Sequence, residues 1–387
     1  MSRDFFEKFG FRYSSEFDEY YKNAVNQLEA YGNKILNVED DSLFGIYRDE
    51  INSCAVELSK DADNSVYAYL LAELINKGKD DIVYALSKPY ENKKMAIYDI
   101  LPLFSLVWCL PEMTEEHKRR NIPEIVTRDT IGMIENQVGD FVALNGHVGI
   151  SSYVNWMMSF IKCRIIRVGR FNFEICRFNN RYVVIRNSDK AVALSDGEVY
   201  HSSGRVLGSI GCEDAQNSFK CEFVEENDFF EGCVCDGEYC GRRPQRFYKS
   251  DGWELALRCG DPIVSVHIPT GGPLNVETCN KDFKFGADII KRCFGNFKAF
   301  YCSSWLLDPQ LKRIIGKETN LTAFADRFVS FPVKSSGNEV FEYVFNLHAA
   351  VSPSELNTTT SLSKALKEHF ISGGHIYGAA GIFFDEV

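Results

Sequence analysis

Residues 261–305, DPIVSVHIPTGGPLNVETCNKDFKFGADIIKRCFGNFKAFYCSSW, contain the pattern that decides the fold. An apolar, β-branched run at 263–268 predicts a buried strand. The segment 270–273 holds the glycines and the proline that break regular structure. Apolar residues at three- and four-residue steps then predict an amphipathic helix over 275–294, and a second apolar run at 299–302 predicts another strand. The order strand, glycine turn, helix, strand is that of a βαβ unit.

The glycine turn of this unit predicts a site for an anion. Peptide N–H groups in such a turn, and at the start of the helix after it, point toward the space above them and bind phosphate or pyrophosphate. The alternative role of Gly271 and Gly272 is a tight turn that needs positive φ. Because Glu277 in the first helical turn repels phosphate, we expect Lys281 or Lys284 to supply positive charge.

Composition limits the class of protein. A chain of 387 residues, 45% hydrophobic and 13% aromatic, is long enough for two or three domains with a sizeable core. Its net charge of −11 argues against nonspecific nucleic-acid binding and against docking on anionic membranes. Residues 1–15 lack the apolar stretch of a signal peptide, and the longest apolar run, 96–110, is too short to span a bilayer. The thirteen scattered cysteines indicate reduced core thiols, so we expect a cytoplasmic protein.

Helical spacing of apolar residues dominates the first part of the chain, and strand-like alternation the part after it. The expected helices span 17–31, 43–60, 65–76, 93–109, 128–138 and 153–165. The expected strands span 171–177, 181–186 and 191–194, interpreted as a meander, and then 253–258, 328–333, 340–346 and 379–384. Further helices are expected over 362–370 and after the N-caps Asp308 and Asn320. The sequence therefore predicts an α+β protein, with a helical domain at 1–163 and a mixed α/β domain at 164–387.

Several segments together resemble one protein family. They read VHIPTGGPL, FYCSSWLLDPQL, TNLTAFADRF and SLSKALKEHFISGGHIYGAAGIFF in the second half, with IPEIVTRDTI and RVGRFNFEICRF before them. They are similar to a family of two-domain bacterial acyltransferases, which pair a helical N-terminal domain with a GNAT-like C-terminal domain. The family includes N-acyltransferases that attach fatty chains to glycopeptide antibiotics. The likeness covers most of the chain, and its motifs are distinctive in combination and weak singly.

The resemblance implies an acyl-CoA-dependent N-acyltransferase. A small amine, an amino sugar or a natural product would attack the thioester carbonyl directly, with the enzyme supplying position, a base and an oxyanion donor. Coenzyme A would lie along the edge of the first strand, up to Ile268, since its pantetheine arm is rich in amides. Its pyrophosphate would lie near the amides of Thr270, Gly271, Gly272 and Leu274, with Lys281 close by.

Three side chains at the strand ends are the candidate catalytic groups. His267 alternates with Val266 and therefore points to the opposite face, and an imidazole suits proton transfer near neutral pH, so we expect it to be the general base. The alternative is a structural histidine hydrogen-bonded in the sheet. Ser303 and Ser304 follow the second strand, where a hydroxyl could donate to the carbonyl or the leaving thiol. The alternative is that these serines satisfy the backbone of a turn.

Neighbouring residues offer weaker candidates. Tyr301 is a possible acid for the thiolate, and Cys302 is a possible nucleophile, although a buried thiol on an apolar strand is the preferred interpretation, because direct transfer needs no covalent intermediate. Four histidines outside this stretch have no partner evident from the sequence, and core, loop or surface roles are expected for them: His147, His201, His348 and His375.

A metal site is not expected. Cys221, Cys233, Cys235 and Cys240 are close in sequence but lack the paired Cys-x-x-Cys spacing of zinc knuckles.

Two other functions remain open from the sequence. One is a non-catalytic GNAT-like module that binds acyl-CoA or regulates a partner. The other is an O-acyltransferase, or a transferase that takes its acyl group from an acyl carrier protein.

Overall fold

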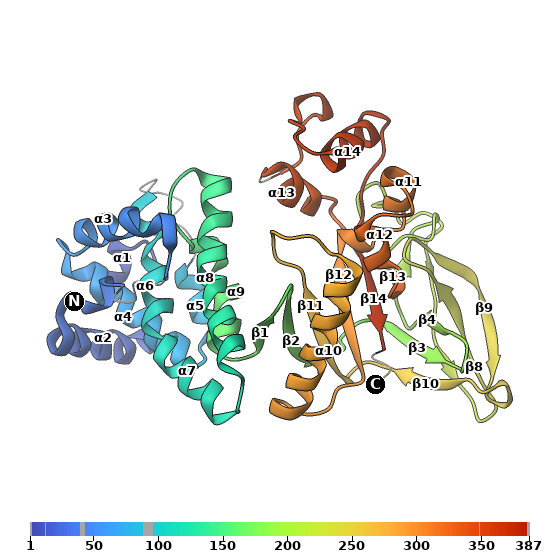
Figure 1. Ribbon diagram of the computed structural model, residues 1–387, viewed down its shortest axis with the longest axis horizontal. Coiled ribbons are helices and arrows are strands. Elements are labelled where there is room, and N and C mark those ends of the chain that lie inside the picture. Colours follow the sequence, from blue (N-terminus) through green and yellow to red (C-terminus); the bar gives the residue numbers. More distant parts are fainter. Residues whose placement is uncertain (1, 12, 39–42, 88–95, 348, 385–387) are drawn as a thin grey trace. The chain divides into compact units, whose positions relative to one another are not determined.

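The computed structural model describes residues 2–11, 13–38, 43–87, 96–347 and 349–384 (Figure 1). The chain divides into two compact units, Met1–Arg167 and Val168–Val387, a few residues beyond the expected division at 163/164. The first unit is helical and the second combines sheets with helices, so the α+β class is confirmed.

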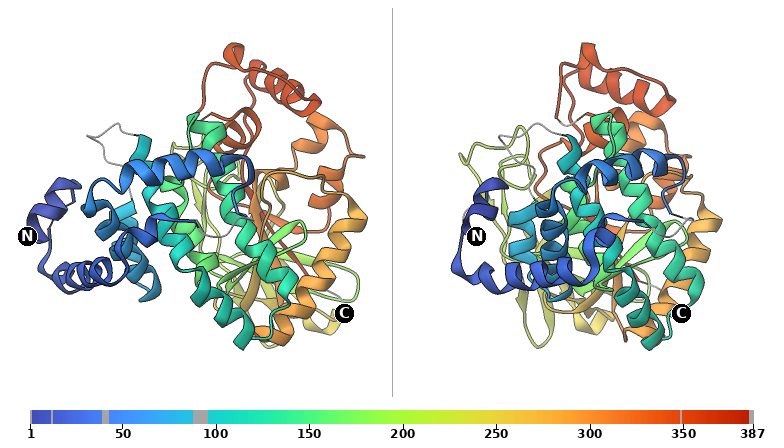
Figure 2. Two further views of the ribbon diagram at one scale, coloured as in Figure 1. Left: turned by 60° about the vertical axis from the view of Figure 1, so that its left-hand side comes forward. Right: turned by 90° about the vertical axis from the view of Figure 1, so that its left-hand side faces the viewer.

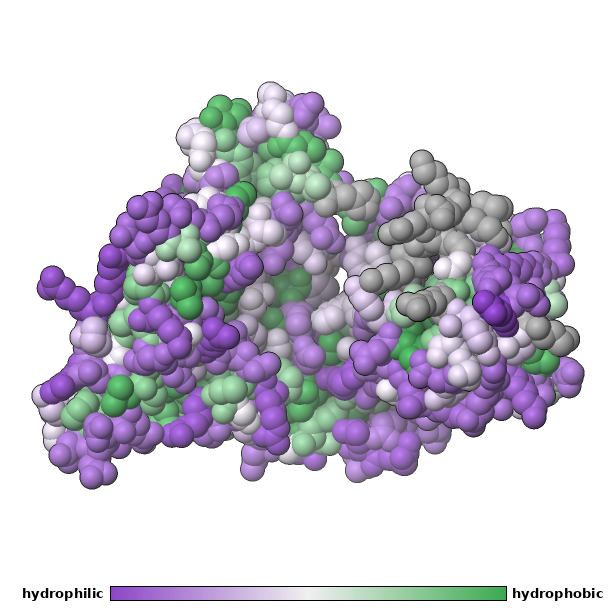
Figure 3. Space-filling model, turned by 180° about the vertical axis from the view of Figure 1, so that it is seen from behind, coloured by the Kyte–Doolittle hydropathy of each residue, from purple (hydrophilic) through white to green (hydrophobic). Residues whose placement is uncertain are grey.

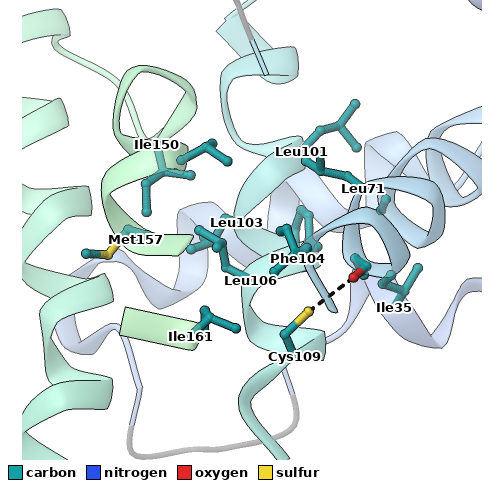
Figure 4. Packing of buried hydrophobic residues seen from close by; sticks show 14 of the residues in the cluster. Ile35, Leu71, Leu101, Leu103, Phe104, Leu106, Cys109, Ile150, Met157 and Ile161 are labelled. Atoms are coloured by element: carbon teal, nitrogen blue, oxygen red, sulfur yellow. Dashed lines mark hydrogen bonds between the residues drawn. The ribbon is translucent and has the colours of Figure 1, made fainter. Parts of the chain in front are cut away.

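The first unit is built around α4 (Ala62–Asn76), which is buried on nearly all sides because its sequence is apolar around the whole helix. Figure 4 shows the core beside it, where Leu103, Phe104 and Leu106 of α6 (Leu101–Trp108) pack together. Cys109 Sγ donates a hydrogen bond to the Ala72 carbonyl at 3.6 Å. The other helices of this unit are α1 (Ser2–Lys8), α2 (Asp18–Tyr31), α3 (Arg48–Leu58), α5 (Asp80–Ser87), α7 (Leu110–Arg119), α8 (Glu124–Asn145) and α9 (Val154–Ile161).

Several of the helices expected here differ in extent. The helix expected at 128–138 is the middle of the longer α8, and the one expected at 153–165 ends at Ile161. Residues 93–95 lie outside the described residues, and the rest of the expected 93–109 helix is a 3-10 turn, Ala96–Asp99, followed by α6. The expected 43–60 helix begins only at α3, after the 3-10 turn Gly45–Tyr47.

The second unit contains a central six-stranded sheet. Its order is β1 (Ile165–Val168), β2 (Phe171–Arg177), β11 (Pro262–His267), β12 (Ala299–Ser304), β14 (Ala379–Phe383) and β13 (Val329–Pro332). β11 and β12 run parallel, joined by α10 (Val276–Cys293), whereas β2 pairs antiparallel with β11 and β14 antiparallel with β12. The predicted βαβ unit is thus the centre of the sheet.

α10 covers one face of this sheet, as Figures 1 and 2 show. The Phe283 ring of α10 lies 5.0 Å from that of Phe300 on β12 and 5.4 Å from that of Phe383 on β14, centroid to centroid. Asn275 caps the helix, because its Oδ1 accepts the Thr278 amide at 2.8 Å. Gly295, at φ +111°, follows the helix end. The predicted apolar face, cap and end of this helix are therefore confirmed.

A second sheet packs on the opposite face. It consists of β10 (Glu254–Leu257), β3 (Tyr182–Arg186), β4 (Ala191–Ser195), β8 (Phe229–Cys235) and β7 (Val224–Glu225), with β9 (Cys240–Tyr248) paired to β8. Tyr182 stacks on Phe331 of the central sheet at 4.2 Å between ring centroids, and its Oη donates to the Pro332 carbonyl at 2.5 Å. The interpretation of β2, β3 and β4 as one meander is wrong, because β2 joins β11 in the central sheet and β3 and β4 form a hairpin in the other.

The C-terminal helices lie at the end of the central sheet toward which β12 runs, α14 farthest out in Figure 2. They are α11 (Leu311–Ile315), α12 (Asn320–Ala325), α13 (Glu339–Phe345) and α14 (Ser361–Ile371). The strand expected at 340–346 is wrong, since α13 occupies it. Val340 and Phe341 pack with Phe370 of α14 while Tyr343 is exposed, a helical distribution that the β-branched and aromatic composition concealed.

The N-caps of two short helices also differ from expectation. α11 starts after Gln310 instead of Asp308, although Asp308 Oδ1 still accepts the Gln310 amide at 3.0 Å. α12 is capped by Thr319, in a capping box with Thr322, instead of by Asn320.

Surface hydropathy and cysteine pairing are the last two features of the fold. Hydrophilic side chains make up most of the face in Figure 3, and within the described part of the chain no helix is long and apolar enough to cross a membrane. Cys221 and Cys233 are joined by a disulfide, so the expectation that all cysteines are reduced is wrong for this pair.

Candidate functional site

His267 ends β11 with its imidazole partly exposed, whereas its neighbour Val266 points to the other face and is buried. Its Nε2 lies 2.8 Å from Oε2 of Glu174 on β2. The strand register explains this contact, because Glu174 lies opposite Ser265 and is therefore the diagonal neighbour of His267 on the same face. The side chains of the pair are 33% and 31% exposed, so solvent reaches both.

The contact with Glu174 fixes the orientation of the imidazole and defines its chemistry. When Nε2–H donates to the carboxylate, the basic lone pair of the neutral ring is on Nδ1. A proton taken up there makes an imidazolium that the carboxylate stabilises at contact distance. An imidazole held by a carboxylate is an arrangement that general-base catalysis uses.

The parallel strands separate beside this pair. Their register runs from Ile263–Ala299 to Ser265–Tyr301 and ends there, although β11 continues to His267 and β12 to Ser304. Because Ser265 and Tyr301 are cross-strand partners, His267 and Ser303, each two residues farther on, share one face of the sheet. The structure thus places His267 and Ser303 on the two sides of the opening, with Ser303 exposed.

The other residues of β12 have different surroundings. Ser304 Oγ accepts the Leu306 amide at 3.2 Å, which is the turn-satisfying role named as its alternative. Burial raises the pKa of Tyr301, and hydrogen bonds from Asn180 and Ser303 oppose the rise. Burial raises the pKa of the Cys302 thiol to about 12, so this thiol stays protonated at neutral pH and is a poor nucleophile.

The glycine turn is open and exposed. Gly271 and Gly272 have φ of +89° and +52°, the positive values that a tight turn needs. A Cβ placed on Gly271 would meet no atom within 4 Å, so its backbone faces open space. Thr270 is exposed in the same turn, whereas Leu274 is buried beneath the start of α10, and Lys281 is exposed on that helix.

The sequence did not indicate Arg170, which lies under this turn. Its Nη1 donates to the Pro269 carbonyl at 2.6 Å and its Nε to the Gly272 carbonyl at 3.2 Å. Its backbone amide donates to the buried Asp282 of α10 at 2.8 Å, and burial lowers the pKa of its guanidinium. A cation from the β1–β2 turn therefore braces the glycine turn, a role that spacing within 261–305 could not reveal.

Asn172 is a second residue that sequence reasoning missed. It lies directly opposite His267 on β2 and is 1% exposed. Its Oδ1 is buried and has no hydrogen-bond partner among the residues that the structure describes. A buried amide oxygen without a partner is costly. Its only signal in the sequence was its position in the period-two run at 171–177.

Two protein-family models match the chain, one in each of its two parts. A family model described as the GNAT-like C-terminal domain matches residues 165–383, and one described as the N-acyltransferase N-terminal domain matches residues 44–163. Among curated proteins, none matches the sequence.

Several solved structures have the same fold. One is an acyltransferase mutant in complex with octanoyl-CoA, with a TM-score of 0.63 and 16% identity over 99% of this chain and 98% of that one. Another is an acyltransferase in complex with decanoyl-CoA and teicoplanin, with a TM-score of 0.61, 16% identity and the same coverage. A third, with CoA and 10C-teicoplanin, has a TM-score of 0.62 and 15% identity, also over 99% and 98% of the two chains.

The chain belongs to the family of acyltransferases that join an N-acyltransferase N-terminal domain to a GNAT-like C-terminal domain.

Proposed function

We propose that this protein is an acyl-CoA-dependent N-acyltransferase in which His267 is the general base. The observation that carries the proposal is the position of the Glu174–His267 pair, at the point where β11 and β12 separate and next to an open glycine turn. A base, a gap between parallel strands and a phosphate-type turn are the parts that direct acyl transfer from a nucleotide thioester requires.

The donor binds across the end of the sheet. The pantetheine amides pair with the strand edge of β11 up to Ile268, where β12 has moved away. The pyrophosphate lies against the amides of Thr270, Gly271 and Gly272 and the N-terminus of α10, with Lys281 contributing charge. Arg170 donates hydrogen bonds to the Pro269 and Gly272 carbonyls. The turn is therefore fixed in its conformation before the ligand binds. The octanoyl-CoA, decanoyl-CoA and CoA complexes of proteins with this fold support the same donor.

The chemistry needs no covalent enzyme intermediate. The acceptor nitrogen attacks the thioester carbon, a C–N bond forms, and the carbonyl electrons move to oxygen. His267 takes the proton from the nitrogen, and Glu174 stabilises the imidazolium. The tetrahedral intermediate then collapses, the C–S bond breaks, and the leaving thiolate is protonated to free coenzyme A. The Ser303 hydroxyl, across the opening, donates a hydrogen bond to the oxyanion or the thiolate.

The acceptor is a small amine or an amino sugar. Teicoplanin in two complexes of the same fold supports a polar natural-product acceptor. An acceptor hydroxyl would attack the thioester by the same route and lose its proton to the same base, so an O-acyltransferase is the competing outcome of the test.

The test has two steps. Thermal unfolding is first measured with acyl-CoAs of different chain length; a ligand at about a hundred times its Kd should add roughly 2.7 kcal/mol of stability. The ligand that stabilises best is then incubated with matched amines and alcohols, and products are identified by mass. Stabilisation followed by amide products is the expected result. Ester products alone would move the assignment to O-acylation. Stabilisation with no product from any acceptor would indicate a binding module, and no stabilisation by any acyl-CoA would exclude this donor.

A further inference from the structure

A cluster of buried cysteines lies on β8 and β9 of the second sheet and in the segment just after β6 (Phe219–Lys220), away from the strands of the site described above. The sulfurs of Cys221, Cys233 and Cys240 all lie within 4.8 Å of one another, and each residue is under 5% exposed. Cys221 and Cys233 are bonded, and Cys240 Sγ lies 4.0 Å from Cys221 Sγ. A fourth buried cysteine, Cys235, lies directly opposite Cys240 in the β8–β9 ladder.

The three convergent sulfurs of Cys221, Cys233 and Cys240 supply three of the four donors of a closed zinc site. Cys235 lies outside this group of sulfurs and, as the ladder partner of Cys240, is the candidate for the fourth. Tetrahedral Zn–S bonds of about 2.3 Å separate the sulfurs by roughly 3.8 Å, close to the spacing found here between Cys221 and Cys240. Thiolates select Zn²⁺ among common divalent ions because they are soft ligands, and a buried site without access for water is structural. A disulfide uses only two of the four sulfurs, whereas a metal ion would engage all of them.

Cys221 lies in a part of the fold with little regular structure, whereas the other three cysteines are on regular strands. Cys221 follows β6 (Phe219–Lys220), in a segment whose other strands, β5 (Val199–Tyr200) and β7, are equally short. Cys233 and Cys235 are on β8, and Cys240 begins β9. Short segments with a small core commonly depend on a metal or a disulfide. A metal here would tie the irregular segment to the β8–β9 hairpin.

We propose that Cys221, Cys233, Cys235 and Cys240, when reduced, bind one structural Zn²⁺. Reduction transfers two electrons and two protons from a dithiol to the Cys221–Cys233 bond, and the dithiol becomes a disulfide. Zn²⁺ then replaces the four thiol protons. The sequence spacing concealed this donor set, because the hairpin brings Cys235 and Cys240 together across a turn instead of through a Cys-x-x-Cys knuckle.

The test is the metal content of the full chain purified with a dithiol reductant and zinc. Mass spectrometry of the eluted metal should give one zinc per chain, lost in Cys240→Ser and kept in Cys259→Ser, a matched control at an exposed free cysteine. The wild-type chain loaded with Co²⁺ should show the thiolate-to-cobalt charge-transfer band, a measurement that does not depend on whether a variant folds. Zinc that stays far below one per chain, or a Co²⁺ spectrum without that band, would overturn the proposal. An unchanged Co²⁺ spectrum in Cys235→Ser would remove that residue from the ligand set.

Discussion

At the residue scale, the account depends on a contact between two side chains on neighbouring strands. His267 contacts Glu174 at 2.8 Å, and His147 makes a similar contact with Asp99 at 3.0 Å. What distinguishes His267 is its place at the end of β11, beside the glycine turn. Glu174 is a positioning residue, because it acts through the imidazole. The sequence shows both residues in alternating runs, but only the antiparallel register of β2 with β11 makes them diagonal neighbours.

Glu174→Gln should lower kcat by roughly tenfold or more while leaving KM for acyl-CoA nearly unchanged, because an amide keeps the shape of the contact but cannot stabilise an imidazolium. Steady-state kinetics checks the split between the two constants. Glu254→Gln, which alters an exposed pair with Arg186 on the other sheet, is the matched control. A kcat within twofold of wild type for Glu174→Gln would remove the carboxylate from the mechanism.

At the element scale, two features predict measurable effects. The β11–α10 turn predicts the effect of a substitution on ligand binding, and the packing of α7 on α8 predicts the effect of pH on stability. The turn needs positive φ at Gly271, and Arg170 donates hydrogen bonds to its carbonyl groups.

On α7, His117 is fully buried, and its Nδ1 lies 2.9 Å from Thr127 Oγ1 of α8. Burial, with a smaller contribution from Arg120, lowers the pKa of His117 to about 4.

Gly271→Ala should weaken acyl-CoA binding, because a side chain at φ +89° shifts the turn whose amides hold the pyrophosphate. Gly260→Ala is the matched control, since Gly260 has φ +90° and its added Cβ would likewise meet no atom within 4 Å. Both changes should cost about 1 kcal/mol of stability. Calorimetric titration should show weaker CoA binding only for Gly271→Ala, with pantetheine, which lacks the pyrophosphate, unaffected. Equal CoA affinity in both variants would contradict this role of the turn.

The buried His117 should make the helical unit sensitive to acid. Below the ordinary pKa of 6.5 the unfolded chain takes up a proton that the folded state does not, so stability is lost as pH falls from about 6.5 to about 4. The loss should approach about 3 kcal/mol. Denaturant unfolding at a series of pH values should show this slope in wild type and a shallower one in His117→Gln. The same pH dependence in both would show that His117 does not carry the effect.

At the scale of the whole molecule, a charged network ties distant parts of the second unit together. Glu238, in the β8–β9 turn, pairs with Arg205 at 2.8 Å and with Arg313 of α11 at 3.0 Å. The Arg205 guanidinium lies over the rings of Tyr239 and Tyr377, 4.8 and 3.6 Å from their centroids. Arg205 and Glu238 are both buried. Removing one of them therefore takes away the counter-charge of the other and lowers the stability of the fold.

Glu238→Gln should therefore destabilise the protein by about 3 kcal/mol, as it leaves a buried guanidinium without its counter-charge. Glu231→Gln, which removes the half-buried partner of the exposed Arg246, should cost under about 1 kcal/mol. Denaturant unfolding of the full chain measures both. Similar values for the two variants would show that the buried network contributes no more than a surface pair.

The sequence predicted the local parts of the site better than the contacts between them. The strand, turn and helix of 261–305 follow from periodicity and capping, which are properties of neighbouring residues. Arg170 and Glu174 come from β2 and the turn before it, and their contacts depend on which strand pairs with β11. Alternation shows which face a residue occupies and not which strand lies beside it, so β2 was assigned to the wrong sheet. The α13 error has a related cause, since β-branched and aromatic composition outweighed helical spacing.

The role of His267 as the base is tested by measuring single-turnover acyl transfer and acyl-CoA affinity in His267→Ala and in His375→Ala, a control at an exposed histidine. We expect His267→Ala to bind acyl-CoA with a Kd within a few-fold of wild type and to transfer the acyl group roughly 10²- to 10⁴-fold more slowly. His375→Ala should match wild type in both. Transfer by His267→Ala at the wild-type rate would contradict the claim that this imidazole takes the proton.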